Sequence, residues 1–315
     1  MEAAFIFDKP VEVKGNLIVL PAAFVAVNQQ QTNESFTGKW QMFEKENNTA
    51  AVEQMQKEWY LKLYGFDDES KLGVFLQDKK VILDAGCGTG FKSAWLASLS
   101  PSSLVIGMDS SESVLAAAKK YSQYKNLFFV QGDIAATAIK QQSVDYINCD
   151  QVIQHTENPE TTFAHLSYLL KPGGQFACYV YAKKALPREL VDDYFRTATH
   201  TIPAAKMWEM SKQLTQLGKS LSELNVKFTS PDIPLLGIKG GEYDIQRFIY
   251  WNFLKCFWKE EWGEALSAST NFDWYAPSNA KRFTKEEFDN MGVINNLTAV
   301  YTHSEEACHT ARFKK

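Results

Sequence analysis

The chain has 315 residues, 45% of them hydrophobic and 22% charged, which is enough to bury one large core and an accessory lobe. Its net charge is −4, and its Lys and Arg residues run no denser than doublets, so it lacks the basic footprint that nucleic-acid backbones require. Composition therefore indicates an ordinary globular protein whose partners do not include nucleic acid.

The cysteines and the N-terminal residues bear on the compartment. Five cysteines lie far apart, without a C-x-x-C pair or a histidine cluster, so we expect neither a disulfide framework nor a metal site. The first ten residues lack a basic signal region, and the apolar run Leu17–Val27 is interrupted by Pro21 and too short to span a bilayer. We expect a cytoplasmic protein without a membrane partner.

The middle third of the chain alternates between short apolar runs and segments with helical spacing. The expected strands are Val81–Ala85, Leu104–Asp109, Leu127–Gln131, Asp145–Cys149 and Phe176–Tyr181, and the expected helices are Phe91–Leu99, Glu112–Tyr121 and Thr161–Leu170. This alternation is typical of a parallel sheet covered on both faces. Right-handed crossovers then bring the carboxyl ends of the strands to one edge, where ligands bind.

The residues before this region differ from it. Thr49–Tyr64 has apolar residues at helical spacing, which predicts an amphipathic helix on the sheet. Residues 1–48 contain short strand-like pieces and the segment NQQQTN, which is typical of a loop. We interpret residues 1–48 as an N-terminal appendage or flap, and residues 49–182 as the core.

The alternation stops after residue 182. Residues 183–281 contain helical segments such as Ala205–Leu224, and we interpret them as an inserted helical lid over the ligand edge. Residues 282–315 return to the core pattern, with helix-start chemistry in Thr284 and Glu287 and two closing strands, Leu297–Thr302 and Ala307–Phe313.

The strand expected at Val81–Ala85 ends in the loop DAGCGTG and leads into a helix. Glycine permits positive φ and lets a ligand approach the backbone closely. The dinucleotide fingerprint G-x-G-x-x-G requires glycine at position 91, where this chain has Phe91, and no Gly-Lys-Ser/Thr triplet of a P-loop follows. The loop thus matches neither phosphate-binding pattern.

This loop resembles the first motif of class I S-adenosylmethionine-dependent methyltransferases, an apolar run followed by an acid and G-x-G-x-G. The resemblance covers residues 50–182 at motif level, including LLKPGGQF before the fifth strand, and residues 282–315 in outline. It implies an α/β fold with a doubly wound, Rossmann-like, mixed seven-stranded sheet.

The resemblance also implies S-adenosylmethionine as cofactor and a set of residues that bind it. In this family the first strand's acid and glycines border the methionine and ribose, the second strand's acid grips the ribose hydroxyls, the third strand's acid accepts the adenine amino group, and the fourth strand's end borders the methionine. The corresponding residues here are Asp84, Gly86, Cys87, Gly88, Gly90, Asp109, Ser110, Asp133, Ile134, Asp150 and Gln151. A carboxylate is the acceptor suited to two hydroxyl donors.

The residues after the fourth and fifth expected strands limit the kinds of methyl transfer that the chain is expected to catalyse. Asp150–Ile153 reads DQVI rather than the Asn/Asp-Pro-Pro-aromatic of base methylation, and Tyr181–Lys184 reads YAKK, without the carboxylates of a catechol-type metal site. His155 suits removal of a proton from a hydroxyl. The alternative is that His155 caps the helix near Asn158 or packs on the cofactor.

Two further residues are candidates for the acceptor side. Tyr181 ends the fifth strand. Asp273, beside Trp274 and Tyr275, suits a polar ring such as a sugar, although these residues also fit a hydrophobic anchor.

The predicted function is transfer of a methyl group to a small polar molecule, first to a hydroxyl of a sugar or related metabolite, with His155, Tyr181 and Asp273 as candidate catalytic residues. A carbon or nitrogen acceptor and a non-catalytic S-adenosylmethionine-binding protein stay open as alternatives, and so does a homo-oligomer.

Overall fold

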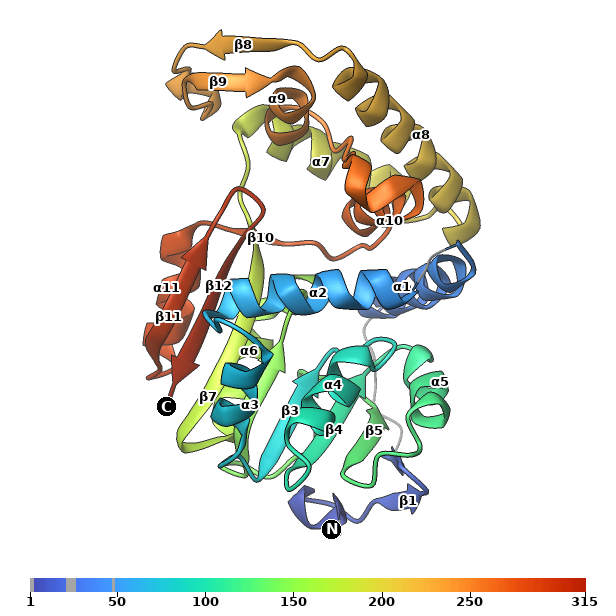
Figure 1. The fold of residues 1–315 in the computed structure, drawn as a ribbon, viewed down its shortest axis with the longest axis vertical. Coiled ribbons are helices and arrows are strands. Elements are labelled where there is room, and N and C mark those ends of the chain that lie inside the picture. The colour runs from blue at the N-terminus through green and yellow to red at the C-terminus, as the bar shows by residue number, and fades with distance from the viewer. Residues whose placement is uncertain (1–2, 21–26, 47–48) are drawn as a thin grey trace. The chain divides into compact units, whose positions relative to one another are not determined.

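A computed structural model of the chain describes residues 3–20, 27–46 and 49–315 (Figure 1). Contacts divide it into two compact units, which we treat separately. The sheet unit consists of Met1–Val27, Ala50–Ala182 and Lys281–Lys315, and the helical unit of Asn28–Thr49 and Lys183–Ala280.

Within the described residues, the sheet unit is built on ten strands in one mixed sheet, in the order β1-β2-β5-β4-β3-β6-β7-β12-β11, with β10 also paired to β7. The strands are β1 Glu12–Lys14, β2 Leu17–Val19, β3 Val81–Ala85, β4 Leu104–Asp109, β5 Leu127–Gln131, β6 Val144–Cys149, β7 Leu170–Ala182, β10 Arg282–Phe283, β11 Thr298–Ser304 and β12 Cys308–Lys314. Strands β2 to β7 in this order run parallel, whereas β12 is antiparallel to β7. This is the expected Rossmann-like α/β fold.

The seven expected strands form the continuous part from β5 to β11, and β3, β4 and β5 have the expected bounds. Strand β7 begins six residues earlier than expected. The sheet is also wider than expected, because β10 joins β7 and the N-terminal hairpin adds β1 and β2. Leu17 of β2 pairs in parallel with Phe129 of β5, and Ile18 is buried against this end of the core.

Helices cover both faces of this sheet. They are α2 Thr49–Tyr64, α3 Glu69–Leu76, α4 Phe91–Leu99, α5 Ser113–Lys120, α6 Pro159–Leu169 and α11 Lys285–Ile294. Two-residue alternation along β3 sends Val81 and Leu83 into one apolar cluster and Ile82 into the other. The predicted helix Thr49–Tyr64 is confirmed, and so is the capping box of Thr284 and Glu287, which begins α11.

The helical unit contains α1 Val27–Glu46, α7 Leu186–Thr199, α8 Ala204–Glu223, α9 Ile245–Asn252 and α10 Gly263–Tyr275, with the hairpin of β8 Lys227–Ser230 and β9 Gly241–Asp244. The expected helix Ala205–Leu224 corresponds to α8. The segment NQQQTN, expected as a loop, is instead part of α1. Its amides bond one turn ahead, Gln31 Nε2 to Ser35 at 2.9 Å, and Gln31 also donates to the Ala276 carbonyl at 3.0 Å, so polar residues stabilise this helix.

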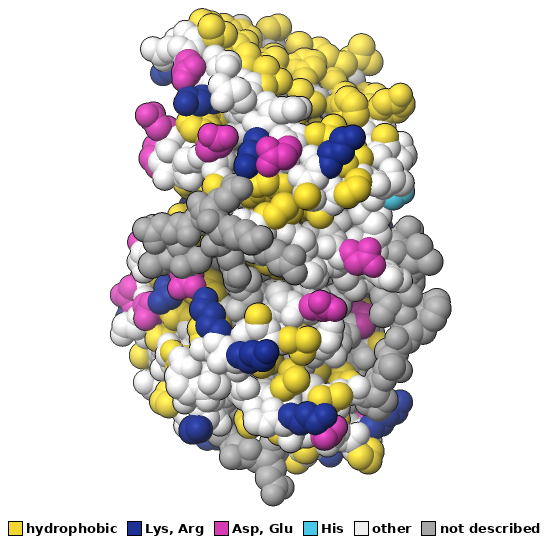
Figure 2. Space-filling view, turned by 90° about the vertical axis from the view of Figure 1, so that its right-hand side faces the viewer, with side chains coloured by type: hydrophobic (Ala, Val, Ile, Leu, Met, Phe, Trp, Pro, Cys, Tyr) yellow, Lys and Arg dark blue, Asp and Glu magenta, His cyan; other side chains and the backbone are white. Residues whose placement is uncertain are grey.

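The surface agrees with the charge pattern of the sequence. Figure 2 shows Lys and Arg side chains interspersed with Asp and Glu on one face rather than gathered into a basic patch. Among the described residues, no helix combines the length and apolar character needed to cross a bilayer.

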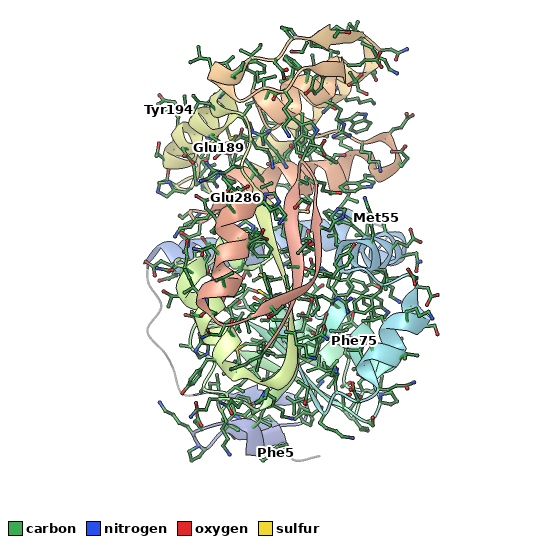
Figure 3. All side chains as sticks on the ribbon, turned by 90° about the vertical axis from the view of Figure 1, so that its left-hand side faces the viewer. Phe5, Met55, Phe75, Glu189, Tyr194 and Glu286 are labelled. Carbon is green, nitrogen blue, oxygen red and sulfur yellow. The ribbon has the colours of Figure 1, made fainter. Side chains whose placement is uncertain are left out.

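Two side chains of α7 differ in their surroundings (Figure 3). The Glu189 carboxylate accepts from the Lys184 amide at 2.9 Å, whereas Tyr194 points outward and is 74% exposed.

Candidate functional site

The glycine loop between β3 and α4 is a sharp turn that side chains would obstruct. Gly86, Gly88 and Gly90 have φ of 84°, 54° and 79°, in the left-handed region that favours glycine. The Gly86 amide donates to the Met108 carbonyl at 2.7 Å, which holds the turn against β4. A Cβ atom added to Gly86 would lie 2.2 Å from Cγ1 of Val152, so the loop after β6 packs directly against this glycine.

We expect the substitution Gly86→Ala to reduce cofactor binding at least tenfold and to destabilise the fold by about 1–3 kcal/mol, because the new methyl group meets Val152 in a strained backbone. Calorimetry with S-adenosylhomocysteine and urea unfolding measure the two effects. Gly173→Ala is the matched control, since Gly173 has φ 81° with nothing within 4 Å of an added Cβ. Equal effects of the two substitutions would show that the contact with Val152 has no role.

Asp84 is the acid at the end of β3 and is 2% exposed. Its carboxylate accepts from Ser93 Oγ at 2.5 Å and from Asn148 Nδ2 at 2.7 Å, so one residue of α4 and one of β6 are fixed to β3. Burial raises the pKa of Asp84, and these two hydrogen bonds oppose the rise. Asp84 thus joins the end of β3 to α4 and β6, and neither Ser93 nor Asn148 was expected from the sequence.

Cys87, between the first two glycines, is buried and points into the protein. Burial raises the pKa of its thiol well above the usual range, with the neighbouring carboxylates Asp109 and Asp84 adding to the rise. Cys87 is therefore a neutral, unreactive thiol in this loop.

Asp109, at the end of β4, is tied to the glycine loop. One carboxylate oxygen accepts from the Gly88 amide at 2.7 Å, and the other accepts from the amide and hydroxyl of Ser111 at 2.8 and 2.6 Å. Ser110 lies between Asp109 and Ser111 in the sequence, and its backbone carbonyl accepts from Gln131 Nε2 at 3.5 Å. The two strand ends that the sequence singled out are thus joined by a hydrogen bond.

Asp133 and Ile134 follow β5 at the same edge. The Asp133 carboxylate accepts from the Ala135 amide at 2.8 Å, which forms a local turn. Ile134 is 6% exposed and packs in the core. The turn fixes the position of Asp133 beyond the carboxyl end of β5.

Asp150, at the end of β6, is the centre of a buried polar cluster. Its carboxylate accepts from the Tyr64 hydroxyl at 2.9 Å and from Gln151 Nε2 at 3.2 Å, and it forms a short ion pair with Lys92. Gln151 has φ of 65°, uncommon for a non-glycine residue, at the point where the chain turns away from β6. Tyr64 and Lys92 come from α2 and α4 and were not foreseen, because only the fold brings them to β6.

His155 and Tyr181 lie together at the carboxyl ends of β6 and β7. His155 ends the short 3-10 helix Ile153–His155, and its Nε2 lies 3.2 Å from the Tyr181 hydroxyl, with the two rings perpendicular. Next to it, Gln154 is fully buried, and neither atom of its side-chain amide has a hydrogen-bond partner among the described residues. Gln154 was not foreseen, since a glutamine in a loop carries no pattern.

Asp273, the third catalytic candidate, belongs to α10 of the helical unit. It forms an ion pair with Lys39 of α1 at 2.7 Å. Burial raises the pKa of its carboxyl, and Lys39 opposes that rise. Its second oxygen, Oδ1, is buried without a hydrogen-bond donor among the residues described.

Comparison of the sequence with known protein families identifies the family to which this chain belongs. Residues 76–263, more than half of the chain, match the family model described as a methyltransferase domain. The chain belongs to this methyltransferase family. It is thus an S-adenosylmethionine-dependent enzyme, and the methyltransferase motifs of the sequence lie within or beside the matched range.

Relatives of this methyltransferase align over parts of their length. A ubiquinone biosynthesis O-methyltransferase of Coxiella burnetii is 28% identical over 58% of this chain and 78% of its own. A demethylmenaquinone methyltransferase of Lactococcus lactis is 34% identical over 36% of this chain and 48% of its own. An uncharacterised Synechococcus protein is 38% identical over 32% of this chain, which spans only 25% of that relative.

Solved structures align more distantly. The 1,6-didemethyltoxoflavin-N1-methyltransferase of Burkholderia thailandensis, crystallised with its substrate and S-adenosylhomocysteine, covers 94% of this chain, which covers 93% of that structure. The sequence identity is 11% and the TM-score 0.47.

Proposed function

We propose that this methyltransferase transfers the methyl group of S-adenosylmethionine to a hydroxyl of a small polar molecule. The observation that carries the proposal is the pair formed by Tyr181 and His155, which lies five residues beyond the buried Asp150 in the sequence. The segment after β6 supports it, because Val152, three residues before His155, packs against Gly86 of the glycine loop. The segment that carries the imidazole thus lies against the glycine loop.

The proposed binding residues for the cofactor are those the resemblance implies. The left-handed glycine turn brings bare backbone close to a ligand at the ends of β3 and β4, and Asp109 and Asp133 follow neighbouring parallel strands. When bound, the cofactor would supply a methyl group carried on a sulfonium. These residues orient it: Asp109 towards the ribose hydroxyls, Asp133 towards the adenine amino group, and Asp150 with Gln151 beside the methionine end.

Transfer from a sulfonium is an in-line displacement on carbon, so the acceptor must be aligned and a hydroxyl must lose its proton. In our proposal, His155 takes this proton and Tyr181 holds the imidazole in place. Gln154 offers a buried donor and acceptor to the substrate beside them. A sugar or related metabolite is the proposed class of substrate.

A carbon acceptor is the second candidate, and the comparisons are what favour it. One relative is named as an O-methyltransferase, whereas another is named as a demethylmenaquinone methyltransferase without mention of oxygen. For a carbon nucleophile the same imidazole would remove a proton from carbon or from an adjacent hydroxyl.

The proposal is tested by supplying the purified protein with S-adenosylmethionine and a panel of polyhydroxylated and phenolic acceptors, and measuring S-adenosylhomocysteine release with mass analysis of the products. We expect micromolar cofactor binding by calorimetry and a mass gain of one methyl group on a hydroxyl-bearing acceptor. Acetylated or methyl-ether analogues of the accepted compound are the controls and should give no product. Cofactor binding without turnover on any acceptor class would instead favour a non-catalytic binding protein.

A further inference from the structure

The helical unit buries more positive than negative charge around α7, α9 and α10. Arg188 is 0% exposed, Lys255 4%, Lys39 5% and Arg196 9%. Two carboxylates accompany them, the fully buried Asp192 and the partly exposed Asp273. A buried charge is costly unless it is paired, so the surplus cation requires an explanation.

Both carboxylates are already paired with other cations. Asp192 accepts from Arg188 Nε at 2.7 Å, from the Tyr275 hydroxyl at 2.7 Å and from the indole of Trp274. Asp273 pairs with Lys39. Lys255 therefore has no carboxylate in contact among the described residues.

The Lys255 ammonium and the Arg188 guanidinium each have hydrogen-bond donors without an acceptor among the described residues. The Lys255 ammonium makes a single hydrogen bond among the described residues, to the Tyr250 hydroxyl at 3.1 Å, and the Nη2 atom of Arg188 has no acceptor among them. The Lys255 nitrogen lies 4.6 Å from the ring centre of Trp274 and 5.1 Å from that of Tyr250. The Arg188 guanidinium lies 5.1 and 5.4 Å from the same two rings. The two cations therefore flank the same aromatic pair.

The electrostatics of Lys255 point the same way. Burial lowers the pKa of its ammonium well below the usual range, and the neighbouring cations Arg188 and Lys184 lower it further. Asp192 and Asp273 oppose this shift without cancelling it. A negative charge beside Lys255 would oppose this shift and raise the pKa of its ammonium.

We propose that the helical unit binds the carboxylate of a small, ring-bearing molecule between Arg188 Nη2 and Lys255 Nζ, with Trp274 and Tyr250 against its ring. Two oxygens match the two unused donors. The surplus of buried charge is positive, which suits an anionic group such as a carboxylate. That this ligand is the methyl acceptor rests on the proposed function, whereas the carboxylate site itself does not.

The probe is benzoate, titrated into the full-length protein by calorimetry, with the isosteric neutral amide benzamide as control. We expect saturable binding of benzoate and at least tenfold weaker binding of benzamide. Lys255→Met should weaken benzoate by about 10- to 100-fold, the scale of one charge-assisted hydrogen bond. This substitution keeps the unbranched shape of the side chain, one atom shorter, and removes a buried ammonium, so we expect the variant to fold.

Proton uptake gives an independent readout. If Lys255 becomes charged when the carboxylate binds, the measured binding heat will change with the ionisation enthalpy of the buffer, and Lys255→Met will abolish this dependence. The groups that face Lys255 and must be considered in the fit are Arg188 and Asp192 of α7, Lys184, Tyr250 of α9, and Asp273 and Tyr275 of α10. Lys259→Met, at an exposed lysine of the same segment, is the matched control and should bind benzoate like the wild type.

Failure of this inference and failure of the proposed function are distinguishable. No saturable benzoate binding, equal binding of benzamide, or benzoate binding unchanged in Lys255→Met would each overturn the carboxylate site, whatever the result with S-adenosylmethionine. Cofactor binding is measured on the same samples, and its loss in the wild type would count against the proposed function alone.

Discussion

His155→Ala should lower the rate of methyl transfer to a hydroxyl acceptor by about 10²- to 10⁴-fold, the usual contribution of a positioned general base. The binding constant for S-adenosylmethionine should stay within about twofold, because His155 bonds to Tyr181 rather than to the glycine loop. Single-turnover rates and calorimetry on the same preparation separate the two quantities. A parallel loss of cofactor affinity and turnover would instead indicate that His155 packs on the cofactor.

Two further variants sharpen this test. Tyr181→Phe removes the hydroxyl 3.2 Å from the imidazole and should give a smaller loss than His155→Ala, because it disturbs only the orientation of the ring. His165→Ala is the matched histidine control. His165 lies on α6, and its ring nitrogen Nε2 lies 3.0 Å from the Thr137 hydroxyl. Loss of the His165 ring should therefore leave turnover within about twofold.

Asp150→Ala should destabilise the protein by about 3–5 kcal/mol, the largest stability effect that we expect from one substitution in the sheet unit. The change leaves the Lys92 ammonium, which is 14% exposed, without its partner and removes the acceptor of the buried Tyr64 hydroxyl. Urea unfolding followed by tryptophan fluorescence measures the loss. Asp150→Asn, which keeps an acceptor for Tyr64, should cost less.

The exposed pair of Lys285 and Asp289 on α11 is the control for this prediction, since both side chains are more than 40% exposed. Asp289→Ala should cost less than about 1 kcal/mol, as expected for surface ion pairs. If Asp150→Ala proved equally mild, the ion pair with Lys92 would not be a closed, desolvated contact.

The sheet was predictable because its signal is local. Runs such as Val81–Ala85 are mostly apolar and are buried along their whole length, as expected for a strand covered on both faces. The glycine loop after it predicts a turn from its composition alone. The strand positions and the expected cofactor edge could therefore be predicted from single segments. The family resemblance then assigned the acids at the strand ends. This information lies within stretches of five to ten residues, and folding preserves it.

What escaped prediction is non-local. Tyr64 and Lys92 reach Asp150 from α2 and α4, and Asn148 reaches Asp84 from the neighbouring strand β6, contacts that no spacing in the sequence encodes. The segment NQQQTN was misjudged because polar composition normally favours a loop, whereas Gln31 finds acceptors 169 and 245 residues away. Tertiary partners, rather than helix propensity, account for α1.

The hairpin of β1 and β2 has a consequence for solubility. Without it, β5 would end the sheet with the sequence LFFVQ and unpaired backbone amides, the kind of strand that recruits a second molecule into a growing aggregate. With it, the outermost strand is the three-residue β1, whose exposed Glu12 and Lys14 form an ion pair at 3.2 Å. A short, charged strand is a poor template, so these few N-terminal residues act as a gatekeeper that keeps the sheet from pairing with its neighbours.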